Sequence, residues 1–575
     1  MNETKSLPSR DAFYSTIQES SITEEEHKFA KLVWKKFEIK NLTEYCKLYC
    51  RIDTLLLAEI FEKFRHTMMN FSGLDPAHYV SLPGFGWDTM LKTTKCEIGL
   101  PTDIDQVHFI ENSIRGGLSF INTRHAESED PDKSLLRYID ANNLYGLAQS
   151  GKLPYDEYSW LDDDELLDFD VKNVNISGGY GYILEVDLLY PSCLHYHHND
   201  YPLAPEQKKV SFEDLSPFSK MCYKKSTGSE KYVSTKLVSS LEDKKNYVVH
   251  IRNLQLYLSL GMICSKIHRI LKFRQKAFIK PFIDKCTEER KNAKSEFEKG
   301  LFKKICNSCY GKTIENVRGY IKIKLHTSEK SLLKAVSQHT YKNYSIIDEN
   351  VVTTTHSIEE IMHNKPYAAG FTILEYSKHF MYDFFYNKLL KTCGRDSINL
   401  CMTDTDSFIF HIKNNDVYEN KLSSFMDYSN YSTDHKLYNN TKKAQLGYFK
   451  DEISSDKYIA EFVGLRSKCY ALKLQDRING DESFKKTCKG LGKCSIRNRL
   501  KFEEYKKSLF NRVDVRHYFT GIISKKHNIS TVIRNKKALS CFDSKRYIYP
   551  CGIHSSPFGS KLIRKYKGSC FQCGV

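Results

Sequence analysis

The sequence lacks any long apolar run, and no segment approaches the roughly 18–20 residues that a membrane helix requires. This absence argues against an integral membrane protein. The first residues are polar and contain no signal-peptide core, and the sequence shows neither an internal repeat nor a low-complexity tract. Because no secretory signal is present, we expect the 18 cysteines to be reduced thiols in an intracellular protein.

Positive charge is in excess. Lysine and arginine number 87 against 70 acidic residues, which gives a formal net charge of +17. This balance favours a polyanionic partner, with nucleic acid first and an anionic membrane surface second. Hydrophobic residues make up 41% of the 575 positions, so the chain can build true cores, and its length suggests about three or four domains.

Local patterns predict a mixture of helices and strands. A capping box at Thr23 and Glu26 opens a predicted helical region over 23–66, which Pro83 to Gly86 should break. We expect strands over 114–121, 135–145 and 183–188, and two short strands around an acidic turn over 399–412. We also expect a long helical region over 250–312, an aromatic-rich helix over 371–391, and a separate basic domain from 441 onwards.

Two acidic motifs stand next to apolar segments. Asp140 ends a predicted strand and is followed by a turn and Tyr145, whereas Asp404 and Asp406 share a tight turn between apolar residues. Two like charges on one turn repel each other, which is tolerable when a hard divalent cation such as magnesium lies between them. Taken singly, Asp140 is more typical of a helix cap, and the second motif is equally typical of a solvated hairpin turn.

Basic and amide side chains recur at helical spacing. Arg290 and Lys294 are four residues apart, and Lys303, Asn307 and Tyr310 follow at spacings of four and three. A helix face with fixed positive charge and hydrogen-bond donors suits a triphosphate. A solvated lysine-rich helix is the alternative for this segment alone.

The order and spacing of these motifs resemble those of the family B DNA polymerases, and within them the protein-primed branch carried by Polinton (Maverick) transposons. Asp140 to Gly146 is similar to the family's first motif, although Asn143 and Gly146 replace its usual serine and proline. The other similar segments are the second motif at Lys303 to Gly311 (where Gly311 is expected to end the helix), the third at Asp404 to Ser407, the thumb motif at Lys468 to Tyr470 and a C-terminal stretch at Phe542 to Tyr547.

The resemblance implies a DNA-directed DNA polymerase that adds dNTPs to a primer 3′-hydroxyl by two-metal nucleotidyl transfer, with Mg²⁺ or substituting Mn²⁺. It implies Asp140, Asp404 and Asp406 as catalytic acids, with Asp140 and Asp406 as the metal ligands. The implied dNTP-binding residues are Tyr145, Arg290, Lys294, Lys303, Asn307, Tyr310 and Gly311. The implied primer- or DNA-binding residues are Lys468, Tyr470, Arg115, Gly116 and Gly117.

The N-terminal region is similar to part of a proofreading exonuclease. Tyr49 and Asp53 resemble the third motif of the family's 3′–5′ exonuclease, and the two earlier motifs should lie upstream of residue 1. One carboxylate cannot hold a two-metal cluster, so we expect no proofreading. The resemblance therefore predicts an N-terminally truncated exonuclease domain, through a truncated gene or a decaying element.

The implied fold class is α+β, a right hand of palm, fingers and thumb. We expect an exonuclease remnant over 1–66, a connector over 67–130, the first palm part with an insertion over 131–250, fingers over 251–312, a second insertion over 313–365, the second palm part over 366–440, and the thumb with the C-terminal region over 441–575. The implied partners of this monomer are primer-template DNA, dNTPs and a terminal priming protein, with no membrane. We expect the nucleus, with a mitochondrion or a viral factory as alternatives.

Competing interpretations follow from the same residues. A reverse transcriptase or RNA polymerase would share the carboxylate chemistry, and a catalytically inactive transposon remnant would only bind DNA. The Asp404-Thr405-Asp406-Ser407 turn argues against the first, and the retained acids argue against the second. Cys570-x-x-Cys573 resembles half of a zinc site, but no second cysteine pair has matching spacing, so we do not expect a zinc ion.

Overall fold

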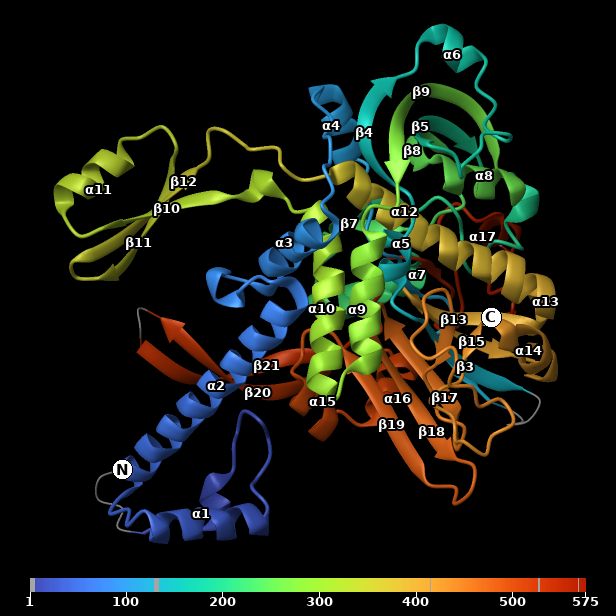
Figure 1. Cartoon of the computed structure of the whole chain (residues 1–575). Coiled ribbons are helices and arrows are strands. Elements are labelled where there is room, and N and C mark those ends of the chain that lie inside the picture. The colour runs from blue at the N-terminus through green and yellow to red at the C-terminus, as the bar shows by residue number, and fades with distance from the viewer. Residues whose placement is uncertain (1–5, 129–133, 414, 526–527, 567, 575) are drawn as a thin grey trace.

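The computed structural model describes residues 6–128, 134–413, 415–525, 528–566 and 568–574 (Figure 1). The N-terminal part is helical, as predicted: Thr23 and Glu26 form the expected capping box. Pro83 does not break this region, because it stands in the first turn of a helix, where a missing N–H leaves no hydrogen bond unmade. The helices are α1 (Glu24–Lys36), α2 (Leu42–Ser72), α3 (Leu82–Thr94) and α4 (Ile104–Glu111).

A ten-stranded sheet forms the centre of the molecule, and it joins segments that are distant in the sequence. Its main path runs through β1 (Ser119–Ile121), β13 (Ile398–Asp404), β14 (Ser407–Ile412), β3 (Leu135–Ala141), β17 (Lys457–Arg466), β18 (Cys469–Asp476) and β19 (Glu482–Cys488). Beside this path, β2 (His125–Glu127) pairs with β17, and β16 (Phe449–Asp451) pairs with β3 and β15 (Met426–Asp427). The predicted domain boundary at 441 is wrong, because residues 449–488 extend this sheet.

An aromatic-rich helix packs on the sheet, as predicted for 371–391. It comprises α12 (Tyr367–Asp383), a π-helical segment (Phe384–Leu390) and α13 (Lys391–Cys393). Phe384 lies against Phe449 of β16, with ring centroids 4.0 Å apart, and Phe385 and Tyr386 are buried in the same core. The burial of these large rings fixes the helix to the strands that carry the acidic motifs.

A second sheet of four strands lies between the two parts of the central sheet in sequence. Its order is β4 (Leu153–Trp160), β9 (Ile263–Lys276), β5 (Tyr180–Leu189) and β8 (Lys244–His250). The long helical region predicted over 250–312, with an interruption near Pro281, is wrong for β9, where Lys and Arg alternate with apolar residues along an amphipathic strand. Neighbouring elements are α6 (Asp163–Leu167), the hairpin β6 (Glu206–Ser211) and β7 (Val233–Val238), α7 (Pro217–Thr227) and α8 (Ile251–Ser259).

Two antiparallel helices, α9 (Lys280–Asn292) and α10 (Glu296–Thr313), stand side by side at the centre of Figure 1. Gly311 lies inside α10 and does not end it, since the helix continues to Thr313. After α10, a three-stranded sheet extends to one side of the molecule. It contains β10 (Ile321–His326), β12 (Val351–Ser357) and β11 (Tyr341–Asp348), with α11 (Glu329–Val336).

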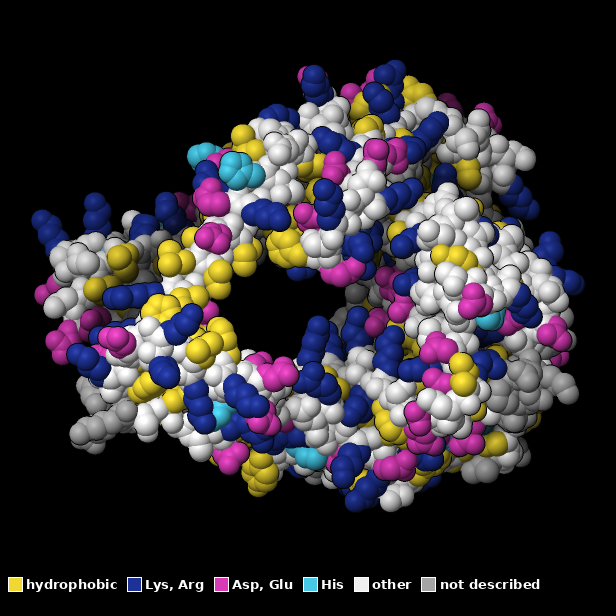
Figure 2. Space-filling model, turned by 60° about the horizontal axis from the view of Figure 1, so that its bottom comes forward, with side chains coloured by type: hydrophobic (Ala, Val, Ile, Leu, Met, Phe, Trp, Pro, Cys, Tyr) yellow, Lys and Arg dark blue, Asp and Glu magenta, His cyan; other side chains and the backbone are white. Residues whose placement is uncertain are grey.

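The C-terminal part adds α14 (Asn415–Leu422), α15 (Lys493–Asn498), α16 (Phe502–Phe510), the long hairpin of β20 (Val515–Lys525) and β21 (Asn528–Leu539), the short hairpin of β22 (Tyr547–Ile548) and β23 (Ser555–Ser556), and α17 (Lys561–Lys565). Arg499 pairs with Glu19 at 2.7 Å, so the N-terminal segment contacts this part. Figure 2 shows an opening through the molecule in this view, with lysine and arginine side chains along its edge. Within the described ranges, no helix is both long and apolar enough to span a membrane.

Candidate active site

The structure brings Asp140 and Asp406 to neighbouring strands, although they are far apart in sequence. Strands β3 and β14 are antiparallel, and their register pairs Asp140 with Ser407. The backbone N–H of Ala141 donates to the carbonyl of Asp406 at 2.7 Å, which fixes the two strand ends together. The juxtaposition that the two-metal interpretation requires is therefore present.

A strained turn carries the second acidic motif. Thr405 has a φ of +66°, and its backbone N–H donates to the carbonyl of Leu118 at 2.6 Å. Gly117 lies directly against this turn: a Cβ on Gly117 would be 2.5 Å from Thr405 Cγ2. A side chain at Gly117 would therefore push the turn away, which gives this glycine a steric role beside the acids.

Burial and mutual repulsion raise the pKa values of the acids. Burial raises the pKa of Asp140 to about 8, and the negative charge of Asp406 adds to this effect. The pKa of Asp406 is also raised, first by burial and further by the charge of Asp404. Two neighbouring, half-buried carboxylates ionise with difficulty, and a hard divalent cation bound between them would stabilise their ionised forms.

Lys468 is paired with the third acid. It stands in the turn between β17 and β18 with a φ of +59°, and its Nζ lies 3.0 Å from Asp404 Oδ1. Tyr470 is buried on the next strand, with its hydroxyl 3.4 Å from that of Tyr138. Because Lys468 already compensates Asp404, the carboxylates left for a cation are Asp140 and Asp406.

Two tyrosines stack beside the acids. Tyr145 of α5 (Leu144–Gln149) and Tyr310 of α10 have ring centroids 4.4 Å apart and ring planes within 7°. Asn143 precedes α5 with a φ of +48°, and a Cβ on Gly146 would be 2.2 Å from Asn143 Nδ2. The unusual Asn143 and Gly146 therefore fit each other, and together they direct Tyr145 toward α10.

One face of α10 presents the predicted cation and amide. Lys303 is exposed, and its charge lowers the pKa values of both Asp140 and Asp406 against the larger effect of burial. Asn307 Oδ1 and Arg290 Nε are buried and have no hydrogen-bond partner within the described part of the chain. The open Nε–H of Arg290 is a donor and suits a bound anion, whereas the open Oδ1 of Asn307 is an acceptor and suits a donor group of a nucleotide.

Arg290 and Lys294 do not share a helix face, contrary to the prediction. Helix α9 ends at Asn292, and Lys294 is exposed in the turn before α10, where its backbone N–H donates to Glu298 Oε2 at 2.9 Å. Arg290 remains on the last turn of α9. Arg290 therefore lies on α9 and Lys294 in the turn between α9 and α10.

Arg115 is not available as a DNA contact. It is 8% exposed, its guanidinium donates to the carbonyl of Val248, and it lies 4.1 Å from the centroid of the Tyr247 ring. Its neighbour Gly116 is exposed, with open space around it. Tyr49 and Asp53 are also exposed, one turn apart on α2 and away from the acids on the central sheet.

Comparison with known proteins agrees with this geometry. Residues 6–391, more than half of the chain, match the family described as DNA polymerase type B, organellar and viral. The chain belongs to this family. The prediction of a family B DNA polymerase is thus confirmed, and with it a DNA-directed DNA polymerase activity that uses a divalent metal cofactor.

Solved structures give the same fold. Phi29 DNA polymerase, in a ternary complex with primer-template DNA and incoming nucleotides, has a TM-score of 0.50 and 16% identity to this polymerase, covering 80% of this chain and 68% of its own. An orthorhombic crystal form of phi29 DNA polymerase also has a TM-score of 0.50 and 16% identity, covering 79% and 68%. No curated protein matches the chain. The likeness confirms the α+β right-hand fold of this polymerase.

Two lysines near the acids of the polymerase were not predicted as part of its site. Lys485 of β19 lies 4.3 Å from the centroid of the Tyr138 ring, and its charge acts on Asp140. Lys545 donates to the carbonyl of Ser119 at 2.6 Å, beside the strand that ends at Asp404. The sequence places Lys485 in a lysine-rich segment, and only the pairing of β18 with β19 brings it to the site.

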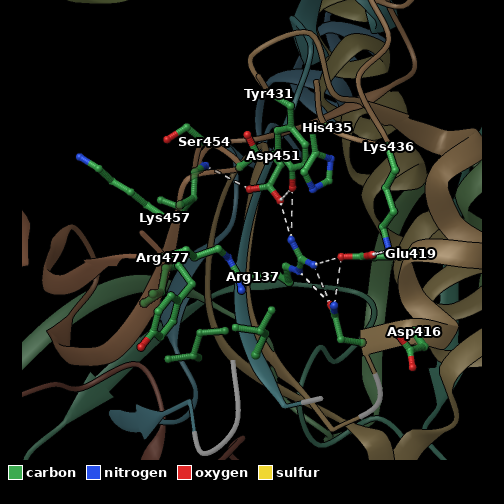
Figure 3. A pocket seen from close by; sticks show the side chains of 17 residues that line it. Arg137, Asp416, Glu419, Tyr431, His435, Lys436, Asp451, Ser454, Lys457 and Arg477 are labelled. Carbon is green, nitrogen blue, oxygen red and sulfur yellow. Dashed lines mark hydrogen bonds and ion pairs between the residues drawn. The ribbon is translucent and has the colours of Figure 1, made fainter. Parts of the chain in front are cut away.

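A cavity of about 350 Å³ is lined by the start of β3, from Leu135 to Arg137, and Figure 3 shows its buried charge network. Arg137 donates to Asp451 at 3.1 Å and to Glu419 at 2.7 Å, while Tyr431 donates to Asp451 at 2.8 Å. The charges compensate one another, which is typical of a structural network. It fastens the strand that carries Asp140 to β16 and α14 of the polymerase.

Proposed function

We propose that the polymerase uses Asp140 and Asp406 as metal ligands in the addition of dNTPs to a primer 3′-hydroxyl. The observation that carries this proposal is the register of β3 and β14, which sets both carboxylates at one edge of the central sheet. Asp404 is the lesser acid, because Lys468 neutralises it at 3.0 Å. The raised pKa values of Asp140 and Asp406 support a site that gains stability from bound positive charge.

The donor set suits two Mg²⁺ ions, with Mn²⁺ as a substitute, because both metals prefer carboxylate oxygens. When bound, such ions lower the pKa of the primer hydroxyl and neutralise the triphosphate and the departing pyrophosphate. Asp140 and Asp406 would hold these ions, and the partial burial of the two carboxylates would strengthen their attraction to the ions.

The incoming dNTP is proposed to lie against α10. Lys303, the open Nε–H of Arg290 and the side-chain amide N–H of Asn307 bind its phosphates, with Lys294 at the entrance. The stacked pair of Tyr145 and Tyr310 forms the floor below the deoxyribose and the base. Tyr145 then excludes a ribose 2′-hydroxyl by contact, so the site selects deoxynucleotides. Gly311, within the same helix, keeps the adjoining surface open: a Cβ there would meet no neighbouring atom.

The primer strand is proposed to pass Lys468 and Gly116, which has open space beside it, while Gly117 lets the Thr405 turn pack closely at this point. Tyr470 supports this position from inside the sheet, since it is buried. Duplex DNA then follows the basic edge of the opening in Figure 2. Because such contacts release counterions, DNA affinity should fall steeply with salt.

Priming by a terminal protein is a further part of the proposal, and it rests on the resemblance to the Polinton branch. The sequence ranges 151–250 and 313–365 fold into sheet-containing units outside the central sheet, as insertions that contact other macromolecules would. A monomer in the nucleus is the state that fits a polymerase of an integrating element.

Asp53 is proposed not to support proofreading. Among the described residues, it belongs to no cluster of three or more side chains that could ligate a metal ion. A single carboxylate cannot bind the two metals of this reaction. The check is the degradation of a mismatched single-stranded 3′ end by native protein and Asp53→Asn: degradation that Asp53→Asn abolishes would overturn this part.

Primer extension tests the proposal as a whole. The native chain, Asp406→Ala and the matched control Asp416→Ala, an exposed acid on α14, are compared on a primed DNA template with MgCl₂ and dNTPs. We expect extension by the native chain and the control, and a loss of about 1,000-fold or more in Asp406→Ala. Equal extension in all three proteins would refute the assignment. DNA binding without extension by the native chain would instead support the inactive remnant, and a preference for an RNA template would support a reverse transcriptase.

A further inference from the structure

Four metal-ligating side chains meet near the C-terminus, away from the acids of the active site. Cys551, His554, Cys570 and Cys573 each offer one ligand atom, and all four atoms lie within 4.8 Å of one another. The spacing is Cys-x-x-His, then 15 residues, then Cys-x-x-Cys. This arrangement has the ligand number and the loop length of structural zinc sites.

The first pair stands in the turn of a hairpin. Strands β22 and β23 pair Tyr547 with Ser556, which folds the intervening turn back on itself. Gly552 has a φ of +75°, so the chain can reverse tightly between the ligands. The backbone N–H of His554 donates to Cys551 Sγ at 3.5 Å, a contact that stabilises a thiolate.

The second pair follows α17 and has the same kind of turn. Cys570 is 1% exposed, and its sulfur lies 3.3 Å from His554 Nδ1. Gly574 has a φ of +76°, and its N–H donates to the carbonyl of Cys570 at 2.8 Å. Each pair is therefore held by a tight turn that contains a glycine with a positive φ, Gly552 in the first and Gly574 in the second.

The distances at the histidine match a tetrahedral metal. His554 Nδ1 lies 3.7 Å from Cys551 Sγ and 3.3 Å from Cys570 Sγ. With Zn–S near 2.3 Å and Zn–N near 2.0–2.1 Å, tetrahedral geometry sets the nitrogen and each sulfur about 3.6 Å apart. The two observed distances lie on either side of this value.

We propose that Cys551, His554, Cys570 and Cys573 bind one Zn²⁺ ion in a closed, structural site. Three thiolates and an imidazole favour zinc over magnesium or calcium, which prefer oxygen ligands. Binding would release the three thiol protons to solvent. Four protein ligands leave no open coordination position, so this ion is not expected to act on the substrate.

The site fastens the C-terminal segment to the catalytic sheet. Arg124, fully buried between β1 and β2, donates from its backbone to the carbonyl of Ile553 at 2.8 Å and from its guanidinium to that of Gly552 at 3.1 Å. Both acceptors lie between the ligands Cys551 and His554. Arg546, just before β22, is also buried and donates to Asn122 at 2.5 Å. The zinc ion would thus fix the loop of residues 551–554, whose carbonyl groups accept the hydrogen bonds of Arg124 next to β1.

Metal analysis of the purified full chain tests the proposal. We expect about one zinc per chain in the native protein and in the control Cys193→Ser, an exposed cysteine outside the cluster. We expect at most about a fifth of that amount in Cys570→Ser. A zinc-free native chain, or an unchanged zinc content in Cys570→Ser, would overturn the proposal.

Cobalt spectroscopy keeps the test decisive if Cys570→Ser does not fold. Native protein prepared with Co²⁺ should show the visible absorption of a tetrahedral site with thiolate ligands, and His554→Cys, which retains four ligands, should bind Co²⁺ with a spectrum shifted toward that of four thiolates. Octahedral, weak absorption in the native chain would contradict the site. A Co²⁺ spectrum that His554→Cys leaves unchanged would remove His554 from it.

Discussion

Replacing Asp140 with asparagine should stabilise the polymerase while it abolishes activity. An exposed carboxyl of an unfolded chain loses its proton near pH 4, whereas burial and Asp406 raise the pKa of Asp140 to about 8 in the folded protein. Between these values the folded state holds more protons than the unfolded state. The free energy of unfolding of the native protein should therefore decrease as the pH rises from about 4 to 8.

The magnitude follows from this difference. Each tenfold change in the protonation equilibrium is worth about 1.4 kcal/mol. At pH 7.5 the carboxyl of Asp140 is largely protonated in the folded protein and ionised in the unfolded chain. The full difference is reduced because the carboxyl is partly exposed and shares its proton with Asp406. We therefore expect Asp140→Asn to raise the free energy of unfolding by about 2–4 kcal/mol. This gain should vanish near pH 4.

Denaturant unfolding in metal-free buffer, at pH 4 to 8, measures the effect. Asp53→Asn is the matched control, because Asp53 is an exposed carboxylate on α2, and it should change the free energy of unfolding by less than about 0.5 kcal/mol. Millimolar Mg²⁺ should stabilise the native chain more than Asp140→Asn. The reasoning fails if Asp140→Asn is less stable than the native chain at pH 7.5, or if Asp53→Asn gains as much.

Three further predictions concern side chains around the same strands. Tyr145→Ala should raise the incorporation of ribonucleotides relative to deoxynucleotides by about tenfold or more, whereas Tyr145→Phe should not; equal selectivity in both would remove the steric role of the ring. Lys468→Ala should lower primer extension by about 100-fold in kcat/KM, and Lys473→Ala, which stands on the same strand pair, should not. Arg137→Met should lower the free energy of unfolding by about 3–5 kcal/mol, because it leaves Asp451 buried without its cation, and adding Asp451→Asn should recover part of the loss in the same denaturation assay.

The sequence predicts the acidic strands well because their signal is local. Apolar residues flank the acids on short strands. Strand β3 ends at Ala141, directly after Asp140, while β13 ends at Asp404 and β14 begins at Ser407, on either side of the acidic turn. The aromatic helix over 371–391 is likewise confirmed, since most of its bulky side chains are buried.

Other features depend on pairing between distant segments, which local patterns do not encode. Strand β9 has basic residues that fit a helix face equally well, and only its neighbours β4 and β5 make it a strand. Arg115 has the charge of a DNA contact but finds Tyr247 and Val248 inside the fold. The second half of the proposed zinc site is Cys551 and His554, on another turn. The sequence-based prediction required a second cysteine pair and therefore missed this cysteine–histidine pair.

Metal-directed cleavage of the backbone tests the central claim most directly, namely that Asp140 and Asp406 hold the same cations. Fe²⁺ replaces Mg²⁺ in the native chain, ascorbate and peroxide generate hydroxyl radicals at the bound ion, and fragment masses locate the cuts. We predict cuts next to both residue 140 and residues 404–406, both suppressed by excess Mg²⁺ and both lost in Asp406→Ala. Cleavage at one of these segments without the other would contradict a shared site.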